Sequence, residues 1–268
     1  MRGAEKEERV EDLSGTHHAH VLYLHGHTPV HRLPAHVKLV GLLVFVVAVL
    51  FIPSQAFWAY ALAGCLLAGV MILAELPAGL VLRRLVVEIP ILVFALLLPF
   101  FGQGETTEVL GLTLSVEGLW GAWTIIAKAT LGLGASIALA STTTIPDIIR
   151  AMDHIRVPRV ITAIAGFMVR YLDIVAGEFS RRKVAMSARG YQPRWWWQTG
   201  PMAQSAGALF IRSYERGERV HQAMVARGFS GRMPSFGDRP ATAREWVVGL
   251  SVPAAALVLA FLSLTVLS

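Results

Sequence analysis

Residues 37–53 read VKLVGLLVFVVAVLFIP, and residues 56–74 follow as AFWAYALAGCLLAGVMILA after only Ser54 and Gln55. Each stretch comes close to the roughly 20 consecutive apolar residues with which an α-helix crosses a bilayer. Pro53 and the two polar residues predict a tight turn, because proline does not continue a helix. The pair therefore indicates two antiparallel membrane helices and decides the class of the fold.

The rest of the chain contains three further apolar stretches, at residues 85–101, 118–140 and 246–267. Of the 268 residues, 54% are hydrophobic and 16% are charged, and the mean hydropathy is +0.56. We therefore predict an all-α membrane protein with about five transmembrane helices. Residues 160–179 are interpreted as an amphipathic helix rather than a further crossing, because Arg170, Asp173 and Glu178 interrupt their apolar stripe.

Positive charge is unevenly distributed between the loops. Residues 102–117 contain no Lys or Arg, whereas residues 141–245 carry 16 Lys and Arg against 8 Asp and Glu, a net charge of +8. Because cytoplasmic loops are enriched in Lys and Arg, we predict a multi-pass protein of the cell membrane with a cytoplasmic N-terminus and an external C-terminus. The predicted organisation is a His-rich cytoplasmic segment, four transmembrane helices, a cytoplasmic region of long helices and a fifth transmembrane helix, at residues 1–36, 37–140, 141–245 and 246–268.

A six-residue phrase occurs twice in the basic region. Residues 185–190 read AMSARG and residues 223–228 read AMVARG, an offset of 38 residues. An aromatic residue follows each copy and an arginine lies four positions before it: Tyr191 and Phe229, and Arg181 and Arg219. A doubled phrase in matching context predicts two similar contacts with partner proteins.

Each copy is expected to end a long helix. Glycine just after the last helical residue is a frequent helix terminator, so each arginine is expected as the last residue of its helix. The planar guanidinium binds carboxylates and carbonyls through two hydrogen bonds, and the small alanines leave room for close approach. The simpler interpretation is that Ala-Arg-Gly only ends a helix. The candidate site is Ala188, Arg189, Gly190, Ala226, Arg227 and Gly228, with Arg181 and Arg219 in support.

Two charged residues fall within predicted membrane helices, Lys128 and Glu88. Ionisable groups in a membrane are candidates for function, and the alternatives are a structural ion pair or a lysine that reaches water. Seven of the nine histidines lie at 17, 18, 20, 25, 27, 31 and 36. Imidazole binds transition metals, but a simple His-rich tail explains the cluster equally well, and no metal site is assigned.

The sequence contains no phosphate-binding loop G-x-x-x-x-G-K-[ST] and no H-E-x-x-H, G-x-S-x-G or C-x-x-C pattern. We therefore predict a chain without catalytic residues or cofactor, for which a partner supplies the energy. A run of three tryptophans, Trp195–Trp197, is interpreted as an anchor at the lipid headgroups.

The chain resembles the transmembrane T component of energy-coupling-factor (ECF) importers, and most closely the cobalt type, the Q subunit of cobalt importers. The resemblance covers about residues 20–267. It is carried by the doubled Ala-Arg-Gly, by Arg212-Ser213-Tyr214-Glu215-Arg216, and by the stretch PVHRLPAHVKL at residues 29–39.

The resemblance implies a scaffold that binds neither ATP nor, in general, the substrate. Two cytoplasmic ATPase subunits of the ATP-binding-cassette type would take Arg189 and Arg227 at the ends of two coupling helices. A membrane-embedded substrate-binding subunit, with a small accessory membrane subunit in the cobalt type, would pack against the scaffold. No nucleic acid is expected among the partners, and the transported ion would be cobalt or nickel.

Three alternatives remain at the level of sequence. A T component for a vitamin would share the same motifs. A self-sufficient secondary transporter or channel would need a site near Lys128 and usually paired repeats. A membrane-embedded enzyme would need acid–base groups, for which the sequence offers Asp147, Asp153 and His154.

Overall fold

The computed structural model describes residues 24, 26, 28–101, 106–109, 112–155, 157–191, 195, 199–229 and 241–267, with backbone alone at 106–109, 112–114 and 267. The chain divides into two compact units. We call the first, Leu22–Ala151 with Arg239–Ser268, the membrane bundle. The second, Met1–Val21 with Met152–Asp238, contains two long helices that we call the crossed pair.

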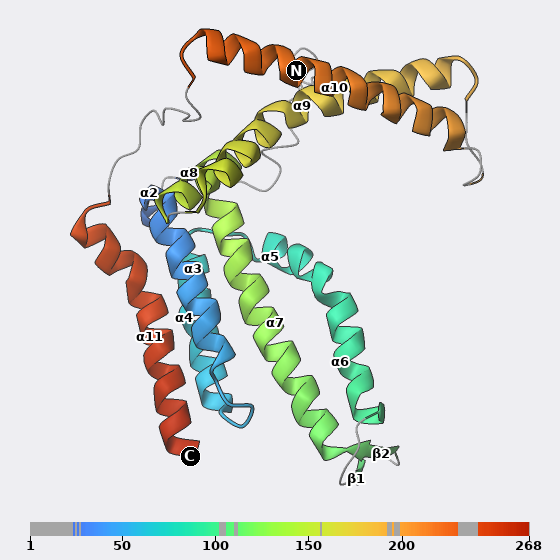
Figure 1. The fold of residues 1–268 in the computed structure, drawn as a ribbon. Helices are drawn as coiled ribbons and strands as arrows, with labels where there is room; N and C mark the ends of the chain where they lie inside the picture. Colours follow the sequence, from blue (N-terminus) through green and yellow to red (C-terminus); the bar gives the residue numbers. More distant parts are fainter. Residues whose placement is uncertain are drawn as a thin grey trace, which may run out of the picture. The chain divides into compact units, whose positions relative to one another are not determined.

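The membrane bundle is built from helices that run alongside one another (Figure 1). A hairpin of two strands, with Thr106 opposite Ser115, leads into α7. The elements are α2 (Pro29–Arg32), α3 (Ala35–Leu50), α4 (Phe57–Leu73), α5 (Ala78–Leu85), η1 (Val86–Glu88), α6 (Ile89–Phe101), β1 (Thr106–Val109), β2 (Leu112–Ser115), α7 (Val116–Thr142), α8 (Ile145–His154, of which the last residues belong to the other unit) and α11 (Ala243–Leu267).

Helix α3 is the centre of the bundle, because it packs against both α7 and α11. Small residues permit this: a Cβ on Gly249 of α11 would lie 2.2 Å from Cγ1 of Val37. The tight turn after α3 is held by the Tyr60 hydroxyl, which donates to the Ile52 carbonyl at 2.9 Å. The buried core comprises Phe45, Ala48, Val49, Ile52, Ala56, Ala59, Tyr60, Ala63, Leu67, Leu131, Ala135, Ala256 and Ala260.

The all-α membrane fold is confirmed, and the helix lengths refine the predicted crossings. Four helices among the described residues are long and apolar enough to cross a bilayer: Ala78–Phe101, Val116–Thr142, Arg159–Ala188 and Ala243–Val266. The predicted first and second spans are shorter, at 16 and 17 residues. That is about 24–26 Å of helix against a hydrocarbon core of about 30 Å.

Two predicted spans differ in detail from the structure. The stretch at 85–101 continues a helix that starts at Ala78, and the axis is interrupted by the 3₁₀ turn Val86–Glu88 just before Pro90. The helix over 160–179 also satisfies the length and hydropathy criteria for a crossing, because its apolar window holds no more than two charged residues. The number of crossings therefore stays a prediction.

The crossed pair consists of α9 (Arg159–Ala188) and α10 (Gly200–Ala226). Helix α10 runs back across α9, and in this view their C-terminal ends lie at opposite sides of the pair (Figure 1). The sequence predicted both helices, with breaks at Gly190 and Gly228. Among the described residues, only Thr162 of α9 and Leu209 of α10 are buried.

Candidate functional site

Helix α9 ends in a hydrogen-bonded cap built by the first motif. Ala188 is the last helical residue, Arg189 is the C-cap with φ −89° and ψ 13°, and Gly190 has φ +81°. The Tyr191 amide donates to the Met186 carbonyl at 3.0 Å, and the Gly190 amide donates to the Ser187 carbonyl at 3.0 Å. These two bonds define a Schellman motif, which satisfies the last carbonyls of the helix.

Helix α10 ends in the same way. Arg227 is the C-cap with φ −94° and ψ 12°, and Gly228 has φ +85°. The Phe229 amide donates to the Met224 carbonyl at 2.9 Å, and the Gly228 amide donates to the Val225 carbonyl at 2.9 Å. The repeated sequence thus produces the same helix end twice. Each arginine is one position beyond the expected last helical residue, because the glycine turns the chain immediately after it.

The exposure of the two helix ends also matches. Both arginines, both glycines and the alanines before them are exposed, whereas the methionine and the following aromatic residue are half-buried in each copy. Neither the Arg189 nor the Arg227 guanidinium is hydrogen-bonded or ion-paired to a described residue. No atom lies within 4 Å of the position a Cβ would take on Gly190 or Gly228. Each tip therefore presents a free bidentate donor beside open space.

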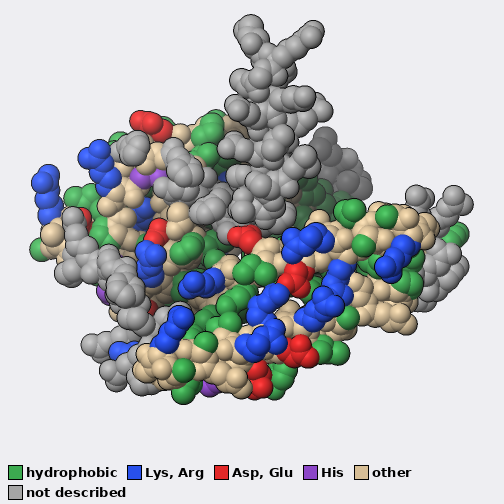
Figure 2. Space-filling model, turned by 90° about the horizontal axis from the view of Figure 1, so that it is seen from above, with side chains coloured by type: hydrophobic (Ala, Val, Ile, Leu, Met, Phe, Trp, Pro, Cys, Tyr) green, Lys and Arg blue, Asp and Glu red, His purple; other side chains and the backbone are tan. Residues whose placement is uncertain are grey.

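The supporting arginines, Arg181 and Arg219, are exposed and lie eight residues before their cap arginines. That spacing is about 12 Å along a helix, so the structure brings neither into contact with its tip. The crossed pair is basic overall: α9 and α10 contain eight Lys and Arg against four Asp and Glu. Figure 2 shows Lys and Arg side chains gathered along these helices.

Two polar contacts join the helices of the crossed pair, and the sequence reading missed both. The Arg216 guanidinium forms an ion pair with the Glu178 carboxylate. The Arg182 guanidinium donates to the Ser205 carbonyl at 3.2 Å. One signal was present: Glu178 and Arg216 are 38 residues apart, the same offset as the two motifs.

The charged residues of the predicted spans have separate neutral partners. The Lys128 ammonium donates to the carbonyl of Leu50 at 2.8 Å, at the end of α3, where a helix leaves carbonyls without partners. Glu88 is buried and accepts from the Thr130 hydroxyl at 2.8 Å. The two therefore do not pair with each other. Lys128 also borders a surface hollow lined with Ser54, Trp120 and Thr124, among others.

The described histidines of the N-terminal cluster take part in local packing. His31 Nε2 is 3.1 Å from the Leu24 carbonyl oxygen and its Nδ1 is 2.6 Å from the Thr28 hydroxyl. The ring of His36 lies 5.7 Å from that of Trp246. His17, His18, His20, His25 and His27 lie outside the described residues. No group of three potential metal ligands occurs among the residues described.

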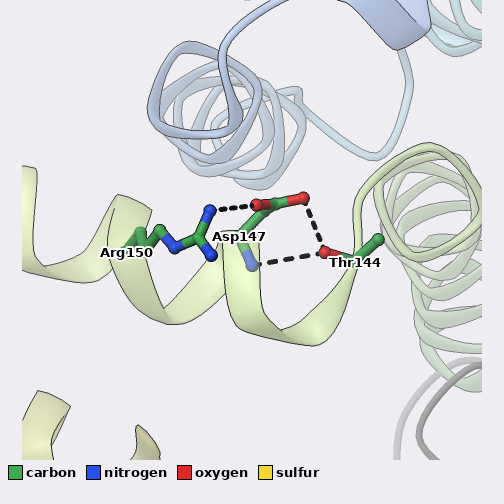
Figure 3. A network of polar contacts seen from close by, with 3 residues as sticks. All are labelled: Thr144, Asp147 and Arg150. Atoms are coloured by element: carbon green, nitrogen blue, oxygen red, sulfur yellow. Dashed lines mark hydrogen bonds and ion pairs between the residues drawn. The ribbon is translucent and has the colours of Figure 1, made fainter. Parts of the chain in front are cut away.

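The junction between α7 and α8 is closed by hydrogen bonds. The Lys38 ammonium donates to the Thr142 carbonyl at 2.8 Å, at the C-terminal end of α7. Thr144 then caps α8: its hydroxyl accepts from the Asp147 amide at 3.4 Å and donates to the Asp147 carboxylate at 2.6 Å (Figure 3). Arg150 pairs with the same carboxylate at 3.0 Å. This geometry gives Asp147 a structural role. Of the tryptophan run, Trp195 is described and is 59% exposed, and Trp196 and Trp197 lie outside the described residues.

The fold and the two helix ends define a multi-pass α-helical membrane protein with a pair of arginine-capped helices. Comparison with known families places it further: the family described as CbiQ, cobalt transport protein, matches residues 26–236, which include both motifs. The chain belongs to this family. The resemblance seen in the sequence is thereby confirmed.

Individual relatives agree with the family match. The chain is 30% identical over 151 residues to the cobalt transport protein CbiQ of Rhodobacter capsulatus, covering 56% of this chain and 61% of that protein. It is 25% identical over 174 residues to an uncharacterised protein of Methanocaldococcus jannaschii, covering 60% and 58% of the two chains. It is 28% identical over 181 residues to a putative fused cobalt transport protein, CbiMQ, of Methanocorpusculum labreanum, covering 62% and 30%. The matched region thus spans less than two thirds of each relative.

Proposed function

We propose that this chain is the membrane scaffold of an ATP-driven ECF importer, and that the importer takes up cobalt or nickel. The observation that carries the proposal is the pair of matching helix ends, each with an exposed arginine at the C-cap. Two copies of one binding element fit a partner that offers two similar sites. Two cytoplasmic ATPase subunits of the ATP-binding-cassette type are such a partner.

The chemistry of the tips fits this role. A guanidinium donates two parallel hydrogen bonds to a carboxylate or to neighbouring carbonyls, and each tip is free to do so. Movement of the ATPases during ATP binding and hydrolysis would then displace the ends of α9 and α10. The crossed pair would pass this movement to a substrate-binding membrane subunit. Arg181 and Arg219 would add positive charge about two turns behind each tip.

The division of labour follows from the sequence and the family. The chain carries none of the nucleotide-binding patterns sought in its sequence, so ATP hydrolysis is assigned to the partner subunits. The cobalt substrate rests on the family description and on the names of two relatives. The fused relative, whose name joins Q to a second letter, supports a membrane partner for this chain.

Charge reversal at the tips tests the proposal. The chain is co-expressed with the ATPases encoded beside it, and the ATPases that co-purify are quantified. A charge-assisted hydrogen bond contributes about 1.5–3 kcal/mol, so Arg189→Glu or Arg227→Glu is expected to weaken binding about 10- to 150-fold. The double variant is expected to retain no ATPase.

A matched control uses Arg150→Glu, which reverses an exposed arginine of α8 that forms no part of the motifs. This variant is expected to retain the ATPases. Undiminished recovery of ATPases with the double variant would contradict the proposal.

A further inference from the structure

The crossed pair has little apolar packing to fix its geometry. Of the described residues in α9 and α10, only Thr162 and Leu209 are buried, and large apolar side chains such as Met168 and Phe210 are 68% and 72% exposed. Helix pairs in globular proteins are normally fixed by ridges of side chains that interlock. Here the polar contacts between the helices carry a larger share of that task.

The ion pair between Glu178 and Arg216 is the contact that joins the two copies of the repeat. Its side chains are 17% and 32% exposed, so both are partly shielded from water. The two residues occupy equivalent positions, since both they and the cap arginines are 38 residues apart. Each lies 11 residues before its cap arginine, which is about 16 Å of helix on either side.

We propose that Glu178 and Arg216 are positioning residues that set the relative placement of the two arginine tips. The ion pair ties α9 to α10 at one defined position on each helix, and the tips extend from it as two arms of equal residue count. A change of about 10° in the angle between the helices would move each tip by about 3 Å, because the arm is about 16 Å long. The proposal rests on the proposed function only in what the tips bind.

A distance measurement between the two arms tests the proposal without any ATPase. Ser187 and Val225 are exposed, occupy equivalent positions and are suitable for spin labels. The single native cysteine, Cys65, is first replaced by serine. Pulsed electron paramagnetic resonance on the full chain in lipid nanodiscs then gives the distribution of distances between the labels. Glu178→Gln and Arg216→Gln each remove one charge, and the double exchange Glu178→Arg with Arg216→Glu restores the attraction.

Each single variant is expected to broaden the distribution or to shift its mean by about 3 Å or more, and the exchange is expected to restore it towards that of the unmodified pair. Arg150→Gln, which removes an ion pair within α8, is the matched control and is expected to change nothing. Unchanged distributions in both single variants would overturn the proposal. A change that the exchange does not reverse would overturn it too, since the effect would then not come from the pairing.

Co-purification of ATPases with the same variants separates this inference from the proposed function. If the distances change as expected, the single variants should also retain less ATPase, by up to about fivefold for the loss of one partly exposed ion pair. If the distances change as expected but even the unmodified chain binds no ATPase, the positioning role stands and the proposed function fails.

Discussion

The membrane bundle and the crossed pair are held together in different ways. The bundle has a contiguous core of thirteen buried apolar residues from α3, α4, α7 and α11 with the turn between α3 and α4, and glycines allow its helices to approach closely. The crossed pair buries only Thr162 and Leu209 among its described residues, and two arginine contacts connect its helices. The difference indicates that the bundle is packed by itself, whereas the crossed pair leaves its surface available for partners.

The largest stability effect is expected in the bundle at Gly118. A Cβ there would lie 2.7 Å from the Leu98 carbonyl oxygen and from the Pro99 Cα, both backbone atoms of α6. Gly118→Ala should therefore destabilise the bundle by about 1–3 kcal/mol through overpacking. Thermal unfolding in detergent measures the effect.

Gly121→Ala is the control in the same helix, because its nearest neighbour is Leu98 Cδ1 at 3.9 Å, an ordinary contact. It is expected to be nearly neutral. Equal unfolding temperatures for the two variants would remove the distinction between a tightly packed bundle and an open pair.

A smaller effect is expected at the helix ends of the crossed pair. The positive φ of Gly190 and Gly228 places any Cβ close to the following carbonyl, so alanine should cost about 1 kcal/mol although the space outside is open. Amide hydrogen exchange of the peptide containing residues 185–191 should be faster in Gly190→Ala. Gly190→Asn should be milder, since asparagine tolerates this conformation. Slower exchange in the asparagine variant than in wild type, or no difference for alanine, would show that the cap does not govern this helix end.

The smallest effect is expected within α10, and it has the opposite sign. Gly207 is exposed and has no atom within 4 Å of a Cβ position. Gly207→Ala should therefore stabilise α10 by about 0.5–1 kcal/mol, since glycine is a poor helix former. Slower amide exchange in α10 is the expected result. Faster exchange would mean that the helix surface at Gly207 is packed rather than free.

The sequence predicted the features that depend on local chemistry. Gly190 and Gly228 predicted where α9 and α10 end, because a left-handed residue after a helix is a local requirement. The helical hairpin followed from Pro53, although α3 already ends at Leu50 because the chain turns before the proline.

The contacts between distant residues could not be predicted in the same way. Glu88 meets Thr130, and Lys128 meets the Leu50 carbonyl, only after three or more helices have packed. The ion pair between Glu178 and Arg216 likewise depends on how two helices cross. The repeat offset marked these two positions as equivalent, but the offset alone does not show that equivalent residues touch.

The central claim is that the two arginine tips contact the same kind of ATPase partner, and site-specific photo-crosslinking tests it most directly. A photoreactive phenylalanine analogue is placed at Ser187 or Val225, the exposed positions two residues before each cap arginine. The control position is Phe261 of α11, which is 67% exposed on the membrane bundle. We predict that illumination of the assembled complex links both tip positions to an ATPase subunit and leaves the control unlinked to it. Crosslinks to an ATPase from neither tip would contradict the account.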